Sequence, residues 1–125
     1  MICPNCGSNI SDGRKRCERC GMDLSLYRKI IYASNQYYNN GLAKAKVRDL
    51  SGAITALRNS LELNKLNTNA RNLLGLVYFE MGETVAALSE WVISKHLQPE
   101  DNNAEEYISR VQSNPTKLEY QNQAI

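Results

Sequence analysis

Four cysteines near the N-terminus, all between Cys3 and Cys20, constrain this 125-residue chain more than any other feature. They form two C-x₂-C pairs separated by ten residues, and a glycine follows each pair, at Gly7 and Gly21. Such a pair turns the backbone tightly and places two sulfurs on one side of a loop, and glycine tolerates the turn that aims amide groups at thiolates. Two such loops can close a tetrahedral four-sulfur metal site, with the ligands Cys3, Cys6, Cys17 and Cys20.

The N-terminal segment needs a cross-link of this kind in order to fold. After the first residue, Met1, the segment up to residue 24 contains only four sizeable aliphatic side chains, at Ile2, Ile10, Met22 and Leu24. So short a segment buries too little apolar surface to offset its chain entropy, whereas a structural metal supplies on the order of 10–16 kcal/mol in comparable small modules. Four thiolates suit Zn²⁺ and leave no open position for catalysis. Iron in the same geometry and a pair of disulfides are the alternatives.

The two loops resemble the zinc-ribbon family through the sequences Cys3-Pro4-Asn5-Cys6-Gly7 and Cys17-Glu18-Arg19-Cys20-Gly21. The resemblance implies a small domain over residues 1–24 with one structural Zn²⁺ on the four cysteines. The spacer between the loops is short for the family, so we expect minimal hairpins. Zinc ribbons bind nucleic acid, bind protein or only stabilise a terminus, and the resemblance therefore implies no single function.

A 34-residue repeat organises the rest of the chain. Residues 34–67 align with 68–101 at six identical positions, which are Asn35/Asn69, Gly41/Gly75, Leu42/Leu76, Ala53/Ala87, Ser60/Ser94 and Leu63/Leu97. A period of this length with helical patterning predicts antiparallel helix pairs that stack. We expect helices over residues 25–46, 50–64, 68–81, 84–97 and 102–113, the last with Asp101 or Asn102 as its cap. Residues 116–125 are a further candidate helix, with Thr116 as its cap.

The second copy resembles the tetratricopeptide repeat (TPR) family at Leu74, Gly75, Tyr78, Ala87, Trp91 and Pro99. The first copy keeps Gly41, Ala53 and Leu57, but it has lysines at the positions of the family's tyrosine and proline. The resemblance implies an all-α fold in which small residues lie where two helices approach and aromatic residues fill the gaps beside them. We therefore expect a TPR-like solenoid of two repeats over residues 25–125, with the terminal helix or helices in residues 102–125.

The TPR resemblance also implies a concave face that binds a peptide or a partner protein. The family's contact positions fall on Asn35, Tyr38, Leu42, Ala45, Lys46, Asn69, Asn72, Leu76, Phe79 and Glu80, and all of these except Ala45 and Glu80 are the predicted partner-binding residues. The residues that some members use to clamp a terminal carboxylate are absent from the corresponding positions. We expect a scaffold or adaptor, and packing of Leu42, Leu76 and Phe79 inside the stack is the alternative interpretation.

Charged residues are distributed unevenly along the chain, although its formal net charge is only +2. Residues 25–66 hold seven bases and two acids, and residues 67–125 hold four bases and eight acids. This asymmetry suits self-association through the ends of the repeat stack. Nucleic-acid binding is the alternative function, through the ribbon and the basic residues Arg14, Lys15, Arg16, Arg19, Lys44, Lys46 and Arg48. Thiol redox sensing by the cysteines is the second alternative.

Catalysis is not expected. The only histidine, His96, has no cysteine partner outside the metal site, and the seven glycines form no phosphate-binding loop. No apolar stretch reaches the length of a transmembrane helix, and the N-terminus lacks the apolar segment of a secretory signal. We therefore expect a cytoplasmic protein with no membrane segment in this chain.

Overall fold

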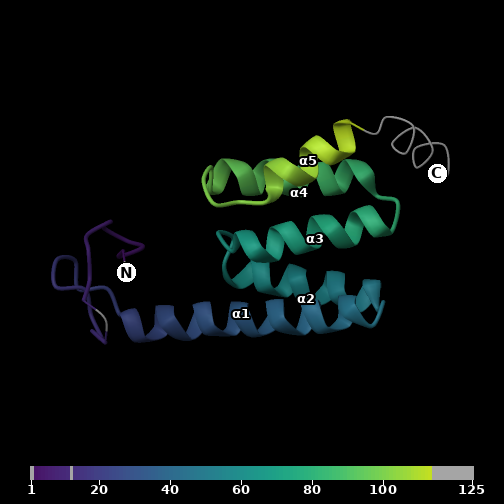
Figure 1. The fold of residues 1–125 in the computed structure, drawn as a ribbon. Coiled ribbons are helices and arrows are strands. Elements are labelled where there is room, and N and C mark those ends of the chain that lie inside the picture. Colours follow the sequence, from purple (N-terminus) through teal and green to yellow (C-terminus); the bar gives the residue numbers. More distant parts are fainter. Residues whose placement is uncertain (1, 12, 114–125) are drawn as a thin grey trace.

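Five helices follow one another in the computed structural model, which describes residues 2–11 and 13–113 (Figure 1). They are α1 (Leu24–Lys46), α2 (Leu50–Leu63), α3 (Thr68–Glu80), α4 (Thr84–Leu97) and α5 (Ala104–Gln112). The described residues contain no β-strand, and their strand-like pairing is limited to two isolated bridges near the N-terminus. The predicted all-α class and the five helices are thus confirmed. The predicted segment 116–125 and its cap Thr116 lie outside the described residues.

Side-chain caps explain where the first three helices begin. The carboxylates of Asp23 and Asp49 accept backbone N–H groups in the first turns of α1 and α2, and the Asn67 amide oxygen does the same for α3. These bonds satisfy donors that a helix start leaves unpaired. The turn between α3 and α4 contains Gly82, whose φ of 82° suits glycine.

The start of α5 differs from the prediction. We expected Asp101 or Asn102 as the cap, but the helix begins at Ala104 and the capping position is Asn103, whose side chain makes no capping bond. The Asn102 amide oxygen nevertheless accepts the Ala104 N–H at 3.0 Å. Asp101 has a φ of 52°, so the chain turns there before it can enter the helix.

The helices pack as successive neighbours. In Figure 1, α1 and α2 run antiparallel, as do α3 and α4, and α5 lies against α4. One apolar core joins α2 to α3 and contains Ala53, Leu57, Leu61, Ala70, Leu74 and Val77. A second joins α4 to α5 and contains Ala87, Trp91, Ala104, Ile108 and Val111. No helix within the described residues combines the length and the apolar character that crossing a bilayer requires.

Two glycines occupy equivalent places in the two antiparallel pairs. A Cβ atom on Gly41 of α1 would come within 2.8 Å of the Leu57 side chain on α2. A Cβ atom on Gly75 of α3 would come within 2.2 Å of the Trp91 indole on α4. Each glycine therefore permits a close approach of its helix to the next one, and the two contacts are related by the repeat lag found in the sequence.

The lag extends to α5. Three buried residues of α3 have buried counterparts one repeat later in α5, which are Ala70/Ala104, Leu74/Ile108 and Val77/Val111. The α3 members pack toward α2 and the α5 members pack toward α4. The sequence comparison aligned residues 34–101 only and so did not detect this third element, although two of the three pairs are identical.

Buried polar side chains join the helix pairs. Ser60 donates to the Ser34 carbonyl at 2.7 Å, and the Asn67 amide donates to the Ser34 hydroxyl at 3.2 Å. The next junction has a similar contact, in which the Asn102 amide donates to the Ser94 hydroxyl at 2.9 Å. Because these groups are paired, their burial avoids the cost of unsatisfied polar atoms.

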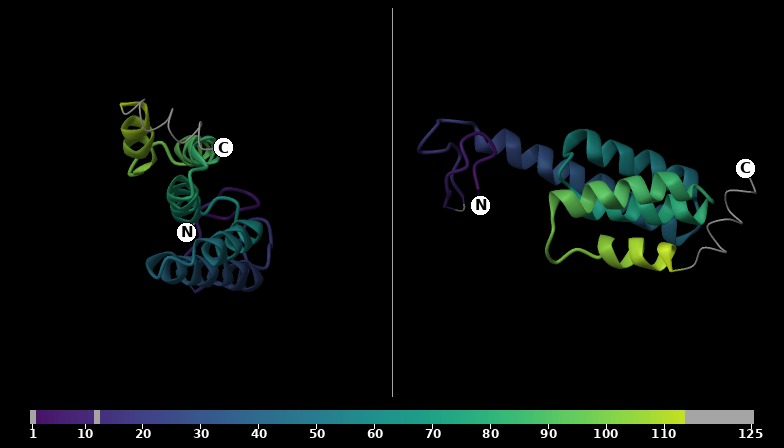
Figure 2. Two further views of the ribbon diagram at one scale, coloured as in Figure 1. Left: turned by 90° about the vertical axis from the view of Figure 1, so that its right-hand side faces the viewer. Right: turned by 90° about the horizontal axis from the view of Figure 1, so that it is seen from above.

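The ribbon segment lies at the N-terminal tip of α1. Figures 1 and 2 show that this tip projects beyond the other helices and carries the segment away from them. Leu24, the first residue of α1, is fully buried in a small cluster with Cys3, Ile10 and Cys17. The Leu24 N–H also donates to the Lys15 carbonyl at 2.7 Å. The first turn of α1 is therefore part of the ribbon's core.

Candidate metal centre

The two cysteine loops, one beginning at Cys3 and the other at Cys17, have the same backbone geometry. In the first loop, the Cys3 N–H donates to the Ser8 carbonyl and the Gly7 N–H donates to the Cys3 carbonyl, both at 2.9 Å. In the second, the corresponding bonds run from Cys17 to Met22 at 3.0 Å and from Gly21 to Cys17 at 2.9 Å. Both glycines have positive φ, 75° and 77°, which is the conformation that glycine adopts without strain.

The loops bring the four cysteine sulfurs together. All four Sγ atoms lie within 4.8 Å of one another, and the Cys3–Cys20 and Cys6–Cys17 pairs are each 3.6 Å apart. A zinc–sulfur distance of about 2.3 Å gives a tetrahedron with edges of about 3.8 Å, which this spacing fits. Four thiolates fill every position of that tetrahedron. The four cysteines therefore form a site for one structural zinc ion.

The ligands differ in exposure. Cys3 and Cys17, the first cysteine of each loop, are buried, whereas Cys6 and Cys20 are exposed. The buried pair faces the small ribbon core, so the metal centre holds that core together from one side. The exposed pair lies on the surface, where reagents in solution can reach it.

Hydrogen bonds prepare the thiols unequally for metal binding. The Ser8 hydroxyl and then the Cys20 N–H lower the pKa of Cys17 from 9.0 to about 5. The Ser8 hydroxyl and backbone also lower the pKa of Cys6. For Cys3, the Cys6 N–H favours the thiolate, but burial and the neighbouring sulfurs outweigh it and raise the pKa to about 11. In the closed loops, the surroundings therefore favour the thiolate at Cys17 and the neutral thiol at Cys3.

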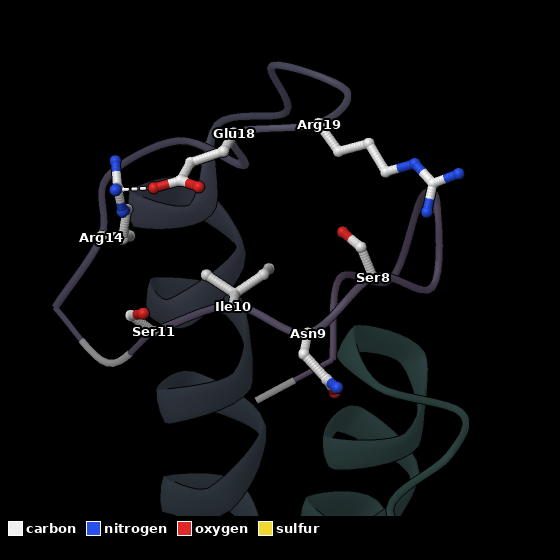
Figure 3. Close-up of a pocket in the computed structure, with 7 residues that line it drawn as sticks. All are labelled: Ser8, Asn9, Ile10, Ser11, Arg14, Glu18 and Arg19. Atoms are coloured by element: carbon white, nitrogen blue, oxygen red, sulfur yellow. Dashed lines mark ion pairs between the residues drawn. The ribbon is translucent and has the colours of Figure 1, made fainter.

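Sequence reasoning missed Ser8. Its hydroxyl lies 3.1 Å from the Cys6 sulfur and 3.5 Å from the Cys17 sulfur, so it contacts one ligand from each loop. The signal in the sequence was a hydroxyl residue directly after the first Cys-Gly pair. Ser8 also lines a small polar depression on the ribbon surface, together with Asn9, Ile10, Ser11, Arg14, Glu18 and Arg19 (Figure 3). The Arg14–Glu18 ion pair lies at one side of this depression.

The predicted partner-binding residues lie on α1 and α3, two helices that contact each other. Asn35, Lys46 and Asn69 are exposed, and the remaining five are partly buried. Tyr38 packs against the α2–α3 core, and Leu76 and Phe79 pack against the α4–α5 core. The Asn72 amide donates to the Asn102 side chain at 2.7 Å. Binding of a partner by this set stays a prediction.

The residues predicted to pack the repeats occupy the helix contacts with one exception. Gly41, Gly75, Ala53, Leu57, Ala87 and Trp91 are buried, and Tyr78 is partly buried. The Tyr78 hydroxyl accepts a hydrogen bond from Arg58 at 2.6 Å. Pro99 is exposed and stands just beyond the end of α4, so its place in the structure is at a helix end and not in a core.

Comparison with known families agrees with the geometry. The model of the zinc-ribbon domain matches residues 2–24, which include all four cysteines and the first residue of α1. A comparison with curated proteins finds no match. The N-terminal segment is thus a zinc-ribbon domain, and the zinc-ribbon match does not extend over the helices that follow it.

Proposed function

We propose that this protein is a non-catalytic scaffold or adaptor. Its helices form a TPR-type stack that binds a peptide or a partner protein, and the zinc ribbon is its structural head. The observation that carries this proposal is the pair of equivalent close approaches at Gly41 and Gly75. Helix pairs repeated at a fixed lag build extended surfaces that suit polypeptide ligands.

The surface of α1 and α3 supports a polar ligand with some apolar side chains. Asn35, Lys46 and Asn69 are exposed, and an asparagine amide can pair with both groups of a peptide bond. The Asn35 amide oxygen already accepts a hydrogen bond from the Asn67 amide at 3.2 Å, so Asn35 contributes chiefly its N–H donors. Leu42, four residues before Lys46 on α1, is partly buried and offers apolar contact. Asn35 and Asn69 also stand one repeat apart, so they present the same chemistry twice along the stack.

A displayed-peptide library selected against the zinc-loaded chain tests this function. We expect enriched peptides whose affinity falls at least about tenfold in the Lys46→Ala/Asn69→Ala double variant. The control is the double variant Ser51→Ala/Glu62→Ala, which removes exposed side chains of α2. Equal losses in the two variants, or a library without enrichment, would contradict the proposed surface.

The nucleic-acid alternative has less support from the contacts. Four of the seven basic residues named for it already have partners within the chain, which are Arg14 with Glu18, Arg16 with the Gly21 carbonyl, Lys44 with Asp49 and Arg48 with Glu80. Binding of a duplex or single-stranded oligonucleotide that weakens steeply with salt would favour this alternative. The same measurement at two salt concentrations therefore separates the two functions.

A further inference from the structure

The two zinc-binding loops are related by a pseudo-twofold symmetry that one side chain breaks. A constant shift along the sequence maps Cys3 onto Cys17 and Cys6 onto Cys20, and the two short sulfur pairs map onto each other at the same 3.6 Å. The backbone hydrogen bonds of the loops also correspond. The residue after each Cys-Gly pair does not correspond, because Ser8 is a hydroxyl residue and Met22 is a thioether.

When the metal is bound, the Ser8 hydroxyl can act only as the hydrogen-bond donor toward the cysteine sulfurs. A metal-bound thiolate carries no proton, so the hydroxyl is the donor and the sulfur is the acceptor. The Cys6 sulfur at 3.1 Å is the nearer acceptor, and the Cys17 sulfur at 3.5 Å is the second. Symmetry would place the Met22 side chain beside Cys20 and Cys3, and a thioether has no hydrogen to donate.

This difference matters at the two exposed ligands. Cys6 and Cys20 are both exposed and occupy symmetry-related positions, so solvent access alone does not distinguish them. A hydrogen bond to a thiolate withdraws electron density from the sulfur and makes it a weaker nucleophile. Cys6 receives this bond from Ser8, whereas the corresponding residue of the second loop, Met22, has no side-chain hydrogen to donate to Cys20.

We propose that Ser8 is a positioning residue of the zinc site that shields Cys6, and that Cys20 is consequently the ligand at which soft carbon electrophiles first modify the protein. In the reaction, the Cys20 sulfur lone pair forms a new S–C bond to an activated alkene. The alkene π bond breaks, and the resulting carbanion takes a proton from water, which leaves a hydroxide ion. The Cys20 sulfur becomes a neutral thioether and would give up its bond to the metal. Atoms and electrons balance without an oxidant or reductant.

The experiment is limited alkylation of the zinc-loaded chain with N-ethylmaleimide, followed by peptide mass spectrometry. We expect Cys20 to be modified about tenfold faster than Cys6. A tenfold difference in rate corresponds to about 1.4 kcal/mol, which a hydrogen bond to a charged group can supply. Release of zinc, followed with a chromogenic chelator, should keep pace with modification of Cys20. Equal rates at the two cysteines, or faster modification of Cys6, would overturn the proposal.

Variants at the symmetry-related positions make the test specific to the hydroxyl. Ser8→Ala should raise the rate at Cys6 to that of Cys20, whereas Ser8→Thr should keep the wild-type order. Ser11→Ala removes a neighbouring exposed hydroxyl that makes no contact with the sulfurs among the described residues, and it serves as the control. An unchanged order of modification in Ser8→Ala would refute the role of Ser8.

The reverse variant, Met22→Ser, places a hydroxyl in the second loop and should slow modification of Cys20. Substitution of Co²⁺ for zinc reports whether each variant keeps a four-thiolate tetrahedral site, because the thiolate-to-cobalt absorption is lost when a ligand is lost. A variant with that absorption intact and modification rates identical to wild type would count against the proposal.

Discussion

Replacement of Gly75 by alanine tests how the helix pairs are held together. Gly75 lies in the middle of α3, and an added Cβ would come within 2.2 Å of Trp91 Nε1 and 2.7 Å of its ring carbons. The indole cannot move aside easily. It is 1% exposed, its ring centroid lies 6.2 Å from that of Phe79 and 5.4 Å from that of Tyr107, and its N–H donates to the Asn72 carbonyl at 3.2 Å.

The expected magnitude follows from two opposing terms. Overpacking of a closed core costs about 1–3 kcal/mol, and a contact this short belongs at the upper end of that range. Alanine regains about 1 kcal/mol over glycine in a helix interior. We therefore expect Gly75→Ala to lower the free energy of unfolding by about 2 kcal/mol. Gly41→Ala meets the Leu57 side chain at 2.8 Å, a milder contact with a more adaptable neighbour, so its net effect should stay within about 1 kcal/mol.

Urea denaturation of the zinc-loaded chain, followed by far-ultraviolet circular dichroism, measures both variants. The matched control is Ser109→Ala, since Ser109 stands one repeat length after Gly75 and is exposed on α5. A double-mutant cycle with Trp91→Phe identifies the cause, because the smaller ring should relieve most of the Gly75→Ala penalty. The same penalty in the wild-type and Trp91→Phe backgrounds would refute the reasoning, as would a larger loss for Gly41→Ala than for Gly75→Ala.

Three further predictions concern the metal and the ion pairs. Chelation of zinc should unfold the ribbon while most of the helical circular dichroism signal persists, because the α2–α3 and α4–α5 cores contain no ribbon residue. Loss of the entire helical signal would contradict this prediction. Zinc binding to the metal-free chain at pH 7 should release close to four protons, because the unfolded ribbon loses the Ser8 and Cys20 hydrogen bonds that lower the pKa of Cys17 in the closed loops; calorimetry in buffers of different ionisation enthalpy counts the protons, and release of only about three would contradict unfolding of the metal-free ribbon. Arg71→Ala should lower the free energy of unfolding by about 1 kcal/mol, and Arg48→Ala should lower it by only about a few tenths of that. The reason is that the 3.0 Å Arg71–Glu90 ion pair is mostly buried, whereas the 3.4 Å Arg48–Glu80 ion pair is exposed. Equal shifts of the thermal unfolding temperature in the two variants would argue against this ranking.

The metal centre could be predicted because its chemistry is local. Four cysteines at fixed spacing, each pair followed by glycine, define both the ligands and the turns that position them. The contact of Ser8 with two sulfurs could not be predicted in the same way. One of those sulfurs belongs to Cys17, in the other loop, and only closure of both loops brings it to the Ser8 hydroxyl.

The helices could be predicted because their signals are periodic and their caps are short-range. The beginning of α5 was misplaced because the positive φ of Asp101 turns the chain before Asn102, and no pattern in the sequence marked that turn. The buried contact of Asn67 with Ser34 joins residues 33 positions apart. Such a contact depends on how the helix pairs stack, which periodicity within each helix does not specify.

The same repeat lag explains why α1 differs from the helices that follow it. The buried residues Ala70, Leu74 and Val77 of α3 correspond to Gln36, Asn40 and Ala43 of α1, which are exposed. In α3 and α5 this face packs toward the preceding helix pair, and α1 is preceded by the ribbon at its tip and by no helix among the described residues. Two of the three α1 residues are polar, so the first helix can leave this face in water without the cost of exposed apolar surface. Three of the substitutions that weaken the internal repeat therefore allow the stack to begin at α1.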